Sequence, residues 1–540
     1  MLDRRYFSTK VVKNMKKTPI FVTALLAAVG AAYVGGAWYC GSVAEQTLDK
    51  RSQIIQGTSG LLQIMSRDYN RGIFVSTETL TIRVSPTHLA SAGQFMPDRI
   101  RALLDSPITI KSRVRHNLWG AKADSSFEFS GEQQKMMKQL FGDTTPFTMT
   151  DNIALSGSGS LKFSVAPLDY EELSGIKIAW QGLQSTTDYE PLYTAYKTNL
   201  NNPGLAVSLA DYFNVSYQGL KYQASSLPSQ PIKTGDTDVS LQEISMHWNR
   251  DKVDYKIRLN EVVKLVSGLQ LGGFINPSIS ILPPDVAAHN IHFAMSSKID
   301  NNYLSGKGLL SFERLNYGDE VYGPMKVEGS AEHLNATAFA AIADSMVSVS
   351  NDNEEGWRSE ILKTLRNKGA ALFTDDPKIT LSTFDLQTPS GKTQIDGSFA
   401  LNAVKKEDLN DFSALLPKIS MKFNYQVPQA MIESFAHTQI QNLFDVEDQK
   451  NAAEIQETVR LMMNNMIADM QKKGYLKIEN GVLMGDIELN QGQLTFSGNL
   501  VSSFEEEDDE NIFEDEEISP ENEPAQEVAQ NNTENALSMP

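Results

Sequence analysis

The chain has 540 residues, 41% of them hydrophobic and 21% charged, which is enough apolar material for a globular body of roughly two or three domains. Its formal net charge of −19 is concentrated at the C-terminus, because residues 505–540 contain 14 Asp or Glu and no Lys or Arg, and the rest of the chain stands at only −5. Since no basic face exists outside the N-terminal segment, the composition excludes the electrostatic footprint of a nucleic-acid-binding protein.

The N-terminal region predicts a membrane anchor. Residues 20–39 contain no charged side chain and, at about 1.5 Å per residue, can span the roughly 30 Å hydrocarbon core of a bilayer. Residues 1–17 contain six Lys or Arg against one Asp, so the positive-inside rule places the N-terminus in the cytoplasm. We predict a cytoplasmic basic segment (1–19), a single transmembrane anchor (20–41) with Trp38 and Tyr39 at the membrane interface, and a main body exported across the membrane.

A cleaved signal peptide is the alternative, since it also combines a basic start with an apolar run. The run here is longer than a signal-peptide core, and Trp38 and Tyr39 stand where a signal peptidase requires small residues. These features favour an uncleaved anchor. Met15 is followed by Lys16 and Lys17, as in a natural N-terminus, so Met1 and Met15 are both candidate start positions.

Small residues recur at a spacing of four within the anchor, at Ala24, Ala28, Ala32 and Gly36. Such a ridge lets two helices approach closely in lipid and predicts a homodimer contact. The alternative is that Ala and Gly are simply frequent in membrane spans, and the two interpretations have equal weight.

The single cysteine, Cys40, excludes an intrachain disulfide. An extracellular eukaryotic domain of this length usually carries several disulfides, whereas burial and strand pairing alone suffice for many bacterial periplasmic proteins. The compartment expected for the main body is therefore the bacterial periplasm, with the anchor in the inner membrane.

Beyond the anchor, apolar residues at helical spacing predict a helical stalk over residues 42–66. From residue 67 the period changes to two, which predicts half-buried antiparallel strands with one apolar and one polar face. Alternating runs include Leu80/Ile82/Val84, Leu161/Phe163/Val165, Ile176/Ile178/Trp180, Val253/Tyr255/Ile257/Leu259, Ile291/Phe293/Met295, Ile379/Leu381, Ile395/Gly397/Phe399 and Leu494/Phe496. Turn-forming clusters separate the strands, at 201–204 (Asn-Asn-Pro-Gly), 388–391 (Thr-Pro-Ser-Gly), 480–481 (Asn-Gly) and 491–492 (Gln-Gly).

Helical spacing interrupts the strands near residues 357–372, 431–444 and 452–473. The last of these helices carries a Met stripe, which is typical of core packing and, alternatively, of an adaptable binding face. The predicted fold is α+β, mostly antiparallel β: an elongated body with a first β-rich region (67–330) and a second α+β region (331–503). Residues 504–540 include six consecutive acids and predict a disordered acidic tail.

Motifs that carry known chemistry are missing from the sequence. It contains no Walker loop, no G-x-S-x-G, no G-x-G-x-x-G after a strand and no H-E-x-x-H. The nearest metal-like pair is His289 and His292, which a strand would point to opposite faces. We therefore assign no catalytic, cofactor-binding or metal-ligating residue, while noting that triads and carboxylate pairs assemble from distant residues.

Four short motifs resemble those of the YdgA-like family of bacterial envelope proteins, whose activity is not established. They are Gly35-Gly36-Ala37-Trp38-Tyr39-Cys40-Gly41, then 69–76 (Tyr-Asn-Arg-Gly-Ile-Phe-Val-Ser), then Ser156-Gly157 with 167–170 (Pro-Leu-Asp-Tyr), and finally 489–494 (Leu-Asn-Gln-Gly-Gln-Leu) with Gly498. The resemblance implies an inner-membrane anchor with a periplasmic domain and supplies no catalytic residue. Arg71 in the second motif is a candidate contact for an anionic group such as a lipid headgroup.

These features predict a non-enzymatic, membrane-anchored periplasmic envelope protein that presents a β-sheet groove to lipid or to a partner protein. The alternative is a periplasmic hydrolase acting on an envelope polymer. A pocket with a buried carboxylate pair or a Ser–His contact would favour the hydrolase, whereas an uncovered apolar sheet face would favour the groove.

Overall fold

The computed structural model describes residues 18–58, 62–85, 105–171, 175–210, 212–249, 257–258, 280–281, 285–348, 363–365, 367–433 and 449–503. The described residues belong to one compact unit that extends to residue 504. The predictions for residues 1–17, for the acidic tail, for the helix near 431–444 beyond residue 433 and for residues 357–362 and 366 of the helix near 357–372 lie outside them, as does most of the alternating run at 253–259.

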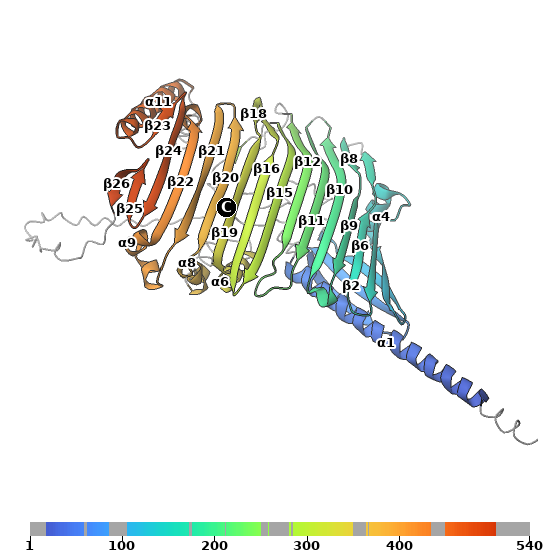
Figure 1. The fold of residues 1–540 in the computed structure, drawn as a ribbon. Coiled ribbons are helices and arrows are strands. Elements are labelled where there is room, and N and C mark those ends of the chain that lie inside the picture. Colours follow the sequence, from blue (N-terminus) through green and yellow to red (C-terminus); the bar gives the residue numbers. More distant parts are fainter. Residues whose placement is uncertain are drawn as a thin grey trace, which may run out of the picture. The chain divides into compact units, whose positions relative to one another are not determined.

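Most of the described chain forms one antiparallel sheet (Figure 1). Its strands are β1 (Leu62–Asn70), β2 (Val75–Val84), β3 (Ile108–His116), β4 (Gly120–Glu128), β5 (Phe147–Ala154), β6 (Gly159–Val165), β7 (Leu168–Glu171), β8 (Ile176–Trp180), β9 (Leu183–Tyr189), β10 (Tyr196–Leu209), β11 (Phe213–Ser226), β12 (Asp236–Trp248), β15 (Val286–Asp300), β16 (Tyr303–Phe312), β17 (Arg314–Tyr317), β18 (Glu320–Tyr322), β19 (Met325–Asn335), β20 (Lys378–Thr388), β21 (Gly391–Leu401), β22 (Ile419–Pro428), β23 (Lys477–Glu479), β24 (Val482–Asn490), β25 (Gln493–Phe496) and β26 (Asn499–Ser503). A separate pair joins β13 (Ile257–Arg258) to β14 (Ser280–Ile281). The predicted mostly antiparallel β fold is therefore confirmed.

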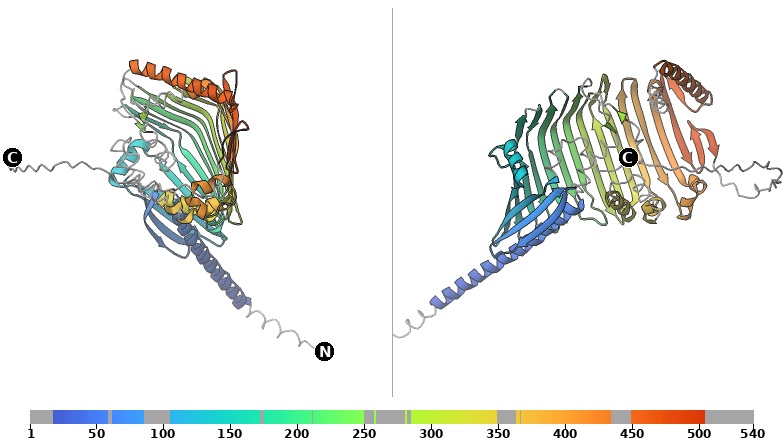
Figure 2. Two further views of the ribbon diagram at one scale, coloured as in Figure 1. Left: turned by 90° about the vertical axis from the view of Figure 1, so that its left-hand side faces the viewer. Right: turned by 180° about the vertical axis from the view of Figure 1, so that it is seen from behind.

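The described helices of more than three residues are α1 (Thr18–Thr58), α4 (Gly131–Phe141), α6 (Ala336–Ser348), α8 (Ala371–Thr374), α9 (Phe412–Leu415) and α11 (Gln449–Lys472), with 3-10 turns η1 (Pro191–Tyr193), η3 (Glu407–Asn410) and η4 (Leu416–Lys418). Residues 429–433 are helical as well. Helices α6, α8 and α9 lie along one end of the strands and α11 lies along the other (Figures 1 and 2). This placement leaves the middle of the sheet between them.

Strands β10, β15 and β24 exchange one partner for another along their length. The first half of β10 pairs with β9 and its second half pairs with β8, while the start of β15 pairs with β17 and the remainder with β16. The turn predicted at 201–204 was wrong, because these residues lie inside β10. Pro203 falls where the partner changes and is outside the register on both sides, so the ladder does not need the N–H that proline lacks.

Tight turns predicted from Gly-containing pairs are confirmed. Asn480 and Gln491 both have a φ of 51°, and the glycine after each has a φ of 75°. Two successive positive φ values match the right-handed twist of the flanking strands, and only Gly and a few polar residues adopt them readily. The Thr388–Gly391 cluster likewise connects β20 to β21.

Helix α1 packs against the sheet along its C-terminal half. Ala44 and Leu48 are fully buried against Val114, Ala123 and Ile153 of the first strands. The helical stalk predicted over 42–66 is therefore corrected in two ways: the helix ends at residue 58, and it covers a sheet face instead of leading away from it. Alternation in 62–70 makes the following segment a strand.

Among the described residues, none of the helices is both long enough and apolar enough for a membrane crossing. The side chains of residues 20–26, which belong to the predicted anchor, lie outside the description.

The division predicted at residues 330 and 331 falls inside a strand. Strand β19 runs from Met325 to Asn335 and pairs with β16 on one side and β20 on the other. Because the ladder continues without interruption, the two predicted regions form a single body.

The helix predicted over 452–473 is confirmed as α11, residues 449–472. Its Met stripe divides into two parts. Met463 and Met470 pack with the buried Ile467 against Leu476 and Leu483, whereas Met462 and Met466 are exposed. Core packing accounts for the first part only.

Candidate functional site

One face of the sheet carries an unbroken row of apolar side chains across the strands. Directly paired residues of neighbouring strands point to the same face, so the register identifies the members. From β10 to β22 they are Leu200, Tyr222, Val239, Phe293, Leu310, Val327, Phe384, Ile395 and Tyr425, each paired with the next. We call this set the apolar row. At about 4.8 Å per strand it extends for about 38 Å.

Further apolar pairs widen this face toward the C-terminal strands. Ile379, Phe399, Met421, Leu489 and Leu494 form a second line of direct partners from β20 to β25. The apolar surface is therefore more than one side chain wide.

The opposite face of the same strands is polar. The neighbours of the apolar row in sequence form their own line of partners: Ser240, His292, Ser311, Lys326, Asp385, Gln394 and Gln426. Water can solvate that face, whereas the apolar row requires a partner to exclude water from it.

Some side chains of the apolar face are exposed. Phe293, Leu310 and Ile379 have exposed fractions of 38%, 41% and 52%, and the neighbouring Met295 is similarly open. The other members of the apolar row are half-buried. Large contiguous apolar surfaces are uncommon on soluble monomers and mark interaction sites.

A cavity of ≈ 260 Å³ lies on the same face, where α1 ends. Its walls are mainly apolar: Arg51, Ile54, Ile55, Leu80, Ile110, Met149, Leu161, Thr187, Tyr193, Tyr196 and Thr198. Leu161, Thr187 and Thr198 are successive cross-strand partners, and Thr198 stands two residues from Leu200 on β10. The cavity therefore adjoins the first member of the apolar row.

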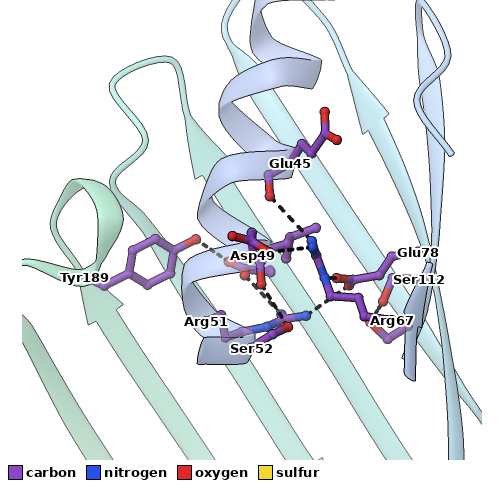
Figure 3. Close-up of polar contacts among 11 residues, drawn as sticks. Glu45, Asp49, Arg51, Ser52, Arg67, Glu78, Ser112 and Tyr189 are labelled. Carbon is purple, nitrogen blue, oxygen red and sulfur yellow. Dashed lines mark hydrogen bonds and ion pairs between the residues drawn. The ribbon is translucent and has the colours of Figure 1, made fainter. Parts of the chain in front are cut away.

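A buried ion network fastens α1 to the sheet beside this cavity (Figure 3). The guanidinium of Arg51 lies 3.2 Å from Glu78 and 3.3 Å from Asp151. Arg67 lies 2.8 Å from both Glu78 and Asp49, and the hydroxyl of Tyr189 donates to Asp151 at 2.6 Å. Each guanidinium is already matched by carboxylates.

Burial governs the protonation of this network. Desolvation raises the pKa of Asp151, although Arg51 and the Tyr189 hydroxyl oppose the shift. Desolvation alone would lower the pKa of Arg51, but the carboxylates of Glu78 and Asp151 outweigh it and raise that pKa. Burial, together with the neighbouring charge of Asp151, also raises the pKa of Tyr189 and Tyr193. Arg51 therefore stays charged.

A Ser–His contact is also present. The Oγ of Ser76 and the Nε2 of His116 are 2.9 Å apart, and both side chains are buried. Burial is the main cause of a lowered pKa for His116. Neither residue lines the cavity, and the backbone of α1 at Gly41 lies directly over the imidazole, where an added Cβ would be 2.9 Å from Cε1.

The predicted site residues lie at the middle of α1 and next to it. Trp38 and Tyr39 are exposed, and the guanidinium of Arg71 lies 4.6 Å from the centroid of the Trp38 ring and 3.4 Å from the carboxylate of Glu45. The anionic group in contact with Arg71 is thus a carboxylate of the chain itself, and a lipid headgroup there stays a prediction.

The small residues predicted to form a helix–helix contact do not share one environment. Ala28 and Ala32 are exposed, whereas Gly36 faces Leu118 of the β3–β4 turn so closely that an added Cβ would overlap it. The side chain of Ala24 lies outside the description. Gly36 therefore serves a contact within the chain.

His289 and His292 follow the strand geometry expected of them. His289 lies 3.7 Å from Glu243 and His292 lies 2.9 Å from Asp238, on opposite faces of the sheet. No group of three or more potential metal ligands occurs among the described residues.

The ion network and the Ser–His contact were not predicted from the sequence. One signal was present for the first: Arg51 interrupts an apolar helical stripe formed by Leu48 and Ile55, which indicates a charge that the fold must pair. Its partners could not be identified, because Glu78 and Asp151 are distant in the chain.

Two comparisons with known proteins give matches over most of the chain. Residues 15–503 match a family described as "Bacterial protein of unknown function (DUF945)". The chain is 21% identical over 516 residues to the protein named Protein YdgA of Escherichia coli (strain K12). The aligned region covers 88% of this chain and 93% of that protein. No solved structure matches the chain.

Proposed function

Since the chain belongs to the DUF945 family of bacterial proteins, whose function is unknown, we propose from its geometry that it is a non-enzymatic envelope protein that holds lipid acyl chains along the apolar face of its sheet. The observation that carries this proposal is the apolar row, which crosses nine consecutive ladder positions while its sequence neighbours form a polar row on the other face.

The structure of the ladder favours a hydrocarbon over a peptide as the occupant. The strands that carry the apolar row are paired on both sides, so their backbone groups offer no free edge for an added strand. A hydrocarbon needs no hydrogen bonds and gains about 25 cal/mol for each Å² of apolar surface removed from water. The row is also longer than the roughly 30 Å hydrocarbon core of a bilayer, which is room for extended acyl chains.

The cellular context proposed is the bacterial inner membrane, with residues 20–41 as anchor, the basic N-terminus in the cytoplasm and the sheet in the periplasm. This rests on the uncharged run at 20–39 and on the six basic residues before it. A sheet tethered beside a bilayer has a source of acyl chains within reach.

Site-specific photo-crosslinking in cells tests the groove. A benzophenone amino acid replaces Phe293 of the apolar row in one variant and His292 in the matched control. These residues are adjacent in sequence, lie on opposite faces and are comparably exposed. We expect phospholipid adducts, identified by mass spectrometry after irradiation, at position 293 and not at 292. Equal adduct yields, or protein adducts alone at 293, would overturn the proposal.

The hydrolase alternative has one observation in its favour, the contact of Ser76 with His116. Both groups are enclosed beneath α1, so a substrate would have to displace the helix. Labelling with a fluorophosphonate probe that is abolished by Ser76→Ala would support the hydrolase, whereas equal labelling of the native protein and the variant would remove its basis.

A further inference from the structure

We propose that four turns beside α1 form a membrane-contact rim, through which the body rests on the bilayer interface next to the anchor. We define the rim by its exposed apolar residues: Ile73 and Phe74 of the β1–β2 turn, Trp119 of the β3–β4 turn, Leu155 of the β5–β6 turn and Leu192 of η1. The inference rests on the proposed membrane anchoring, since it names the second contact that the exported body makes with the same bilayer.

Exposure is the first argument. Trp119 has an exposed fraction of 80%, and the other rim residues lie between 42% and 50%. One exposed apolar side chain needs no explanation, but these occupy the tips of successive connections at one end of the sheet. Large apolar side chains at turn tips point away from the protein body and contribute nothing to its core.

Contacts join these turns to α1 and to one another. The rings of Phe74 and Tyr33 are 5.8 Å apart, and Leu118 of the β3–β4 turn packs on Gly36. The N–H of Leu155 donates to the carbonyl of Trp119 at 3.2 Å.

The fourth connection joins the same group. The β5–β6 turn at Gly157 lies against Val43 of α1 and Pro191 of η1. The rim is therefore one continuous surface around the helix, and α1 extends beyond the neighbouring strands at this end (Figure 2).

The residue types fit a bilayer interface. Trp and Tyr concentrate at the boundary between headgroups and acyl chains, where an aromatic ring and a polar tip are both accommodated. Tyr33, Trp38 and Tyr39 are exposed on α1 at the level of the rim. They would enter the same layer as Trp119.

Charge complementarity favours a lipid surface over a protein partner. Arg115 and Lys122, which flank the Trp119 turn on β3 and β4, are both about half exposed and share a single carboxylate, Asp124. Arg71, beside Trp38, is paired with Glu45, so these three basic side chains face two carboxylates and leave one positive charge in excess behind the rim. Basic side chains a few ångströms behind an apolar rim lie where anionic headgroups would be.

The test measures depth in vesicles. The full-length protein, with Cys40→Ser, is reconstituted into vesicles of phosphatidylcholine and phosphatidylglycerol after a cysteine has been placed at Trp119, Leu155, Val29 or Asp143 and labelled with an environment-sensitive fluorophore. Asp143 is the matched control for Leu155, because it precedes β5 by a few residues whereas Leu155 follows its other end. Trp119 and Leu155 are exposed, so replacing them removes little packing.

We expect blue-shifted emission and quenching by brominated acyl chains at 119, 155 and 29, and neither effect at 143. If the labels at positions 119 and 155 behave like the label at 143 while the label at 29 is quenched, the rim proposal is wrong and the proposed anchor stands. If 29 is not quenched either, the anchoring itself fails. Protection of 119 and 155 from a water-soluble quencher, without quenching by brominated lipid, would show burial against protein and overturn the rim.

Discussion

The guanidinium of Arg51 on α1 lies 3.2 Å from the carboxylate of Glu78 on β2, and both side chains are almost fully buried. Glu78 also accepts from Arg67 on β1, so one carboxylate links a helix and two strands. An anchor helix that continues without a break into this network would transmit its orientation to the sheet. Under the proposed function, the packing of α1 on the sheet is therefore where the membrane anchor and the apolar row would be mechanically connected.

Removing the Arg51 charge should destabilise the fold strongly. In Arg51→Met, Glu78 and Asp151 stay buried without their shared cation, and breaking one side of a buried pair costs about 3–5 kcal/mol. The matched control is Arg115→Met, whose partner Asp124 is exposed to solvent and whose loss should cost less than about 1 kcal/mol. Denaturant unfolding of the full-length variants measures both, and equal losses would contradict the buried network.

Acidification should destabilise the protein through His116. Burial lowers the pKa of His116 below its usual 6.5, so the unfolded chain takes up a proton more readily than the folded one. The contribution of neutral His116 to the free energy of unfolding is complete above pH 6.5 and is lost as the pH falls from 6.5 through the lowered pKa. The variant His116→Gln should show a flatter dependence of the thermal midpoint between pH 7.5 and 5. An unchanged slope in this variant would mean that His116 does not titrate differently in the two states.

A charge on the apolar row should prevent lipid retention. Leu310→Glu places a carboxylate in the middle of the row, and we expect bound phospholipid to fall at least several-fold, because a buried unpaired charge is costly. Ser311→Glu, one residue along on the polar face, should retain native levels. Quantitative lipid mass spectrometry of the purified proteins compares them. Equal retention by the two variants would argue that lipid binds elsewhere.

Glycine at position 41 should be required for the seating of α1. In Gly41→Ala the new Cβ would lie 2.9 Å from the His116 ring, so the helix or the imidazole must shift, at a cost of about 1–3 kcal/mol. Gly35→Ala is the control, because nothing lies within 4 Å of its added Cβ and the helix propensity of alanine is higher by about 1 kcal/mol. Thermal unfolding should rank Gly41→Ala below the native protein. A variant as stable as the control would show that the seating is loose.

Local patterns predicted the strands and helices well in segments whose apolar residues follow a single period. Period-two alternation located β6, β8, β15 and β21, and helical spacing located α11. The 201–204 cluster misled because turn residues also occur where a strand changes partners, which is a tertiary event. The boundary at 330 failed for a similar reason: beyond the predicted stalk, helical spacing was recognised only after it, while the ladder continues across it.

The candidate site was only partly readable from sequence. Each strand shows which of its residues are apolar, but the row exists only once the register places Phe293 opposite Val239 and Leu310. Neither Arg51 nor His116 has a local pattern that identifies its partner, because these contacts join segments that are distant in the chain. Side-chain networks across elements are the part that sequence periodicity does not encode.

The order of strands in the sheet has a consequence for biogenesis. From β2 to β6, from β9 to β12 and from β19 to β22, each strand pairs with the next one along the chain. Low contact order of this kind allows strands to add to a growing edge soon after they emerge, as in repeat proteins. In the proposed topology the N-terminus stays in the cytoplasm and the chain that follows α1 crosses the membrane in sequence order. The sheet could then build outward from α1 during export, with each new strand covering the edge left open by the previous one.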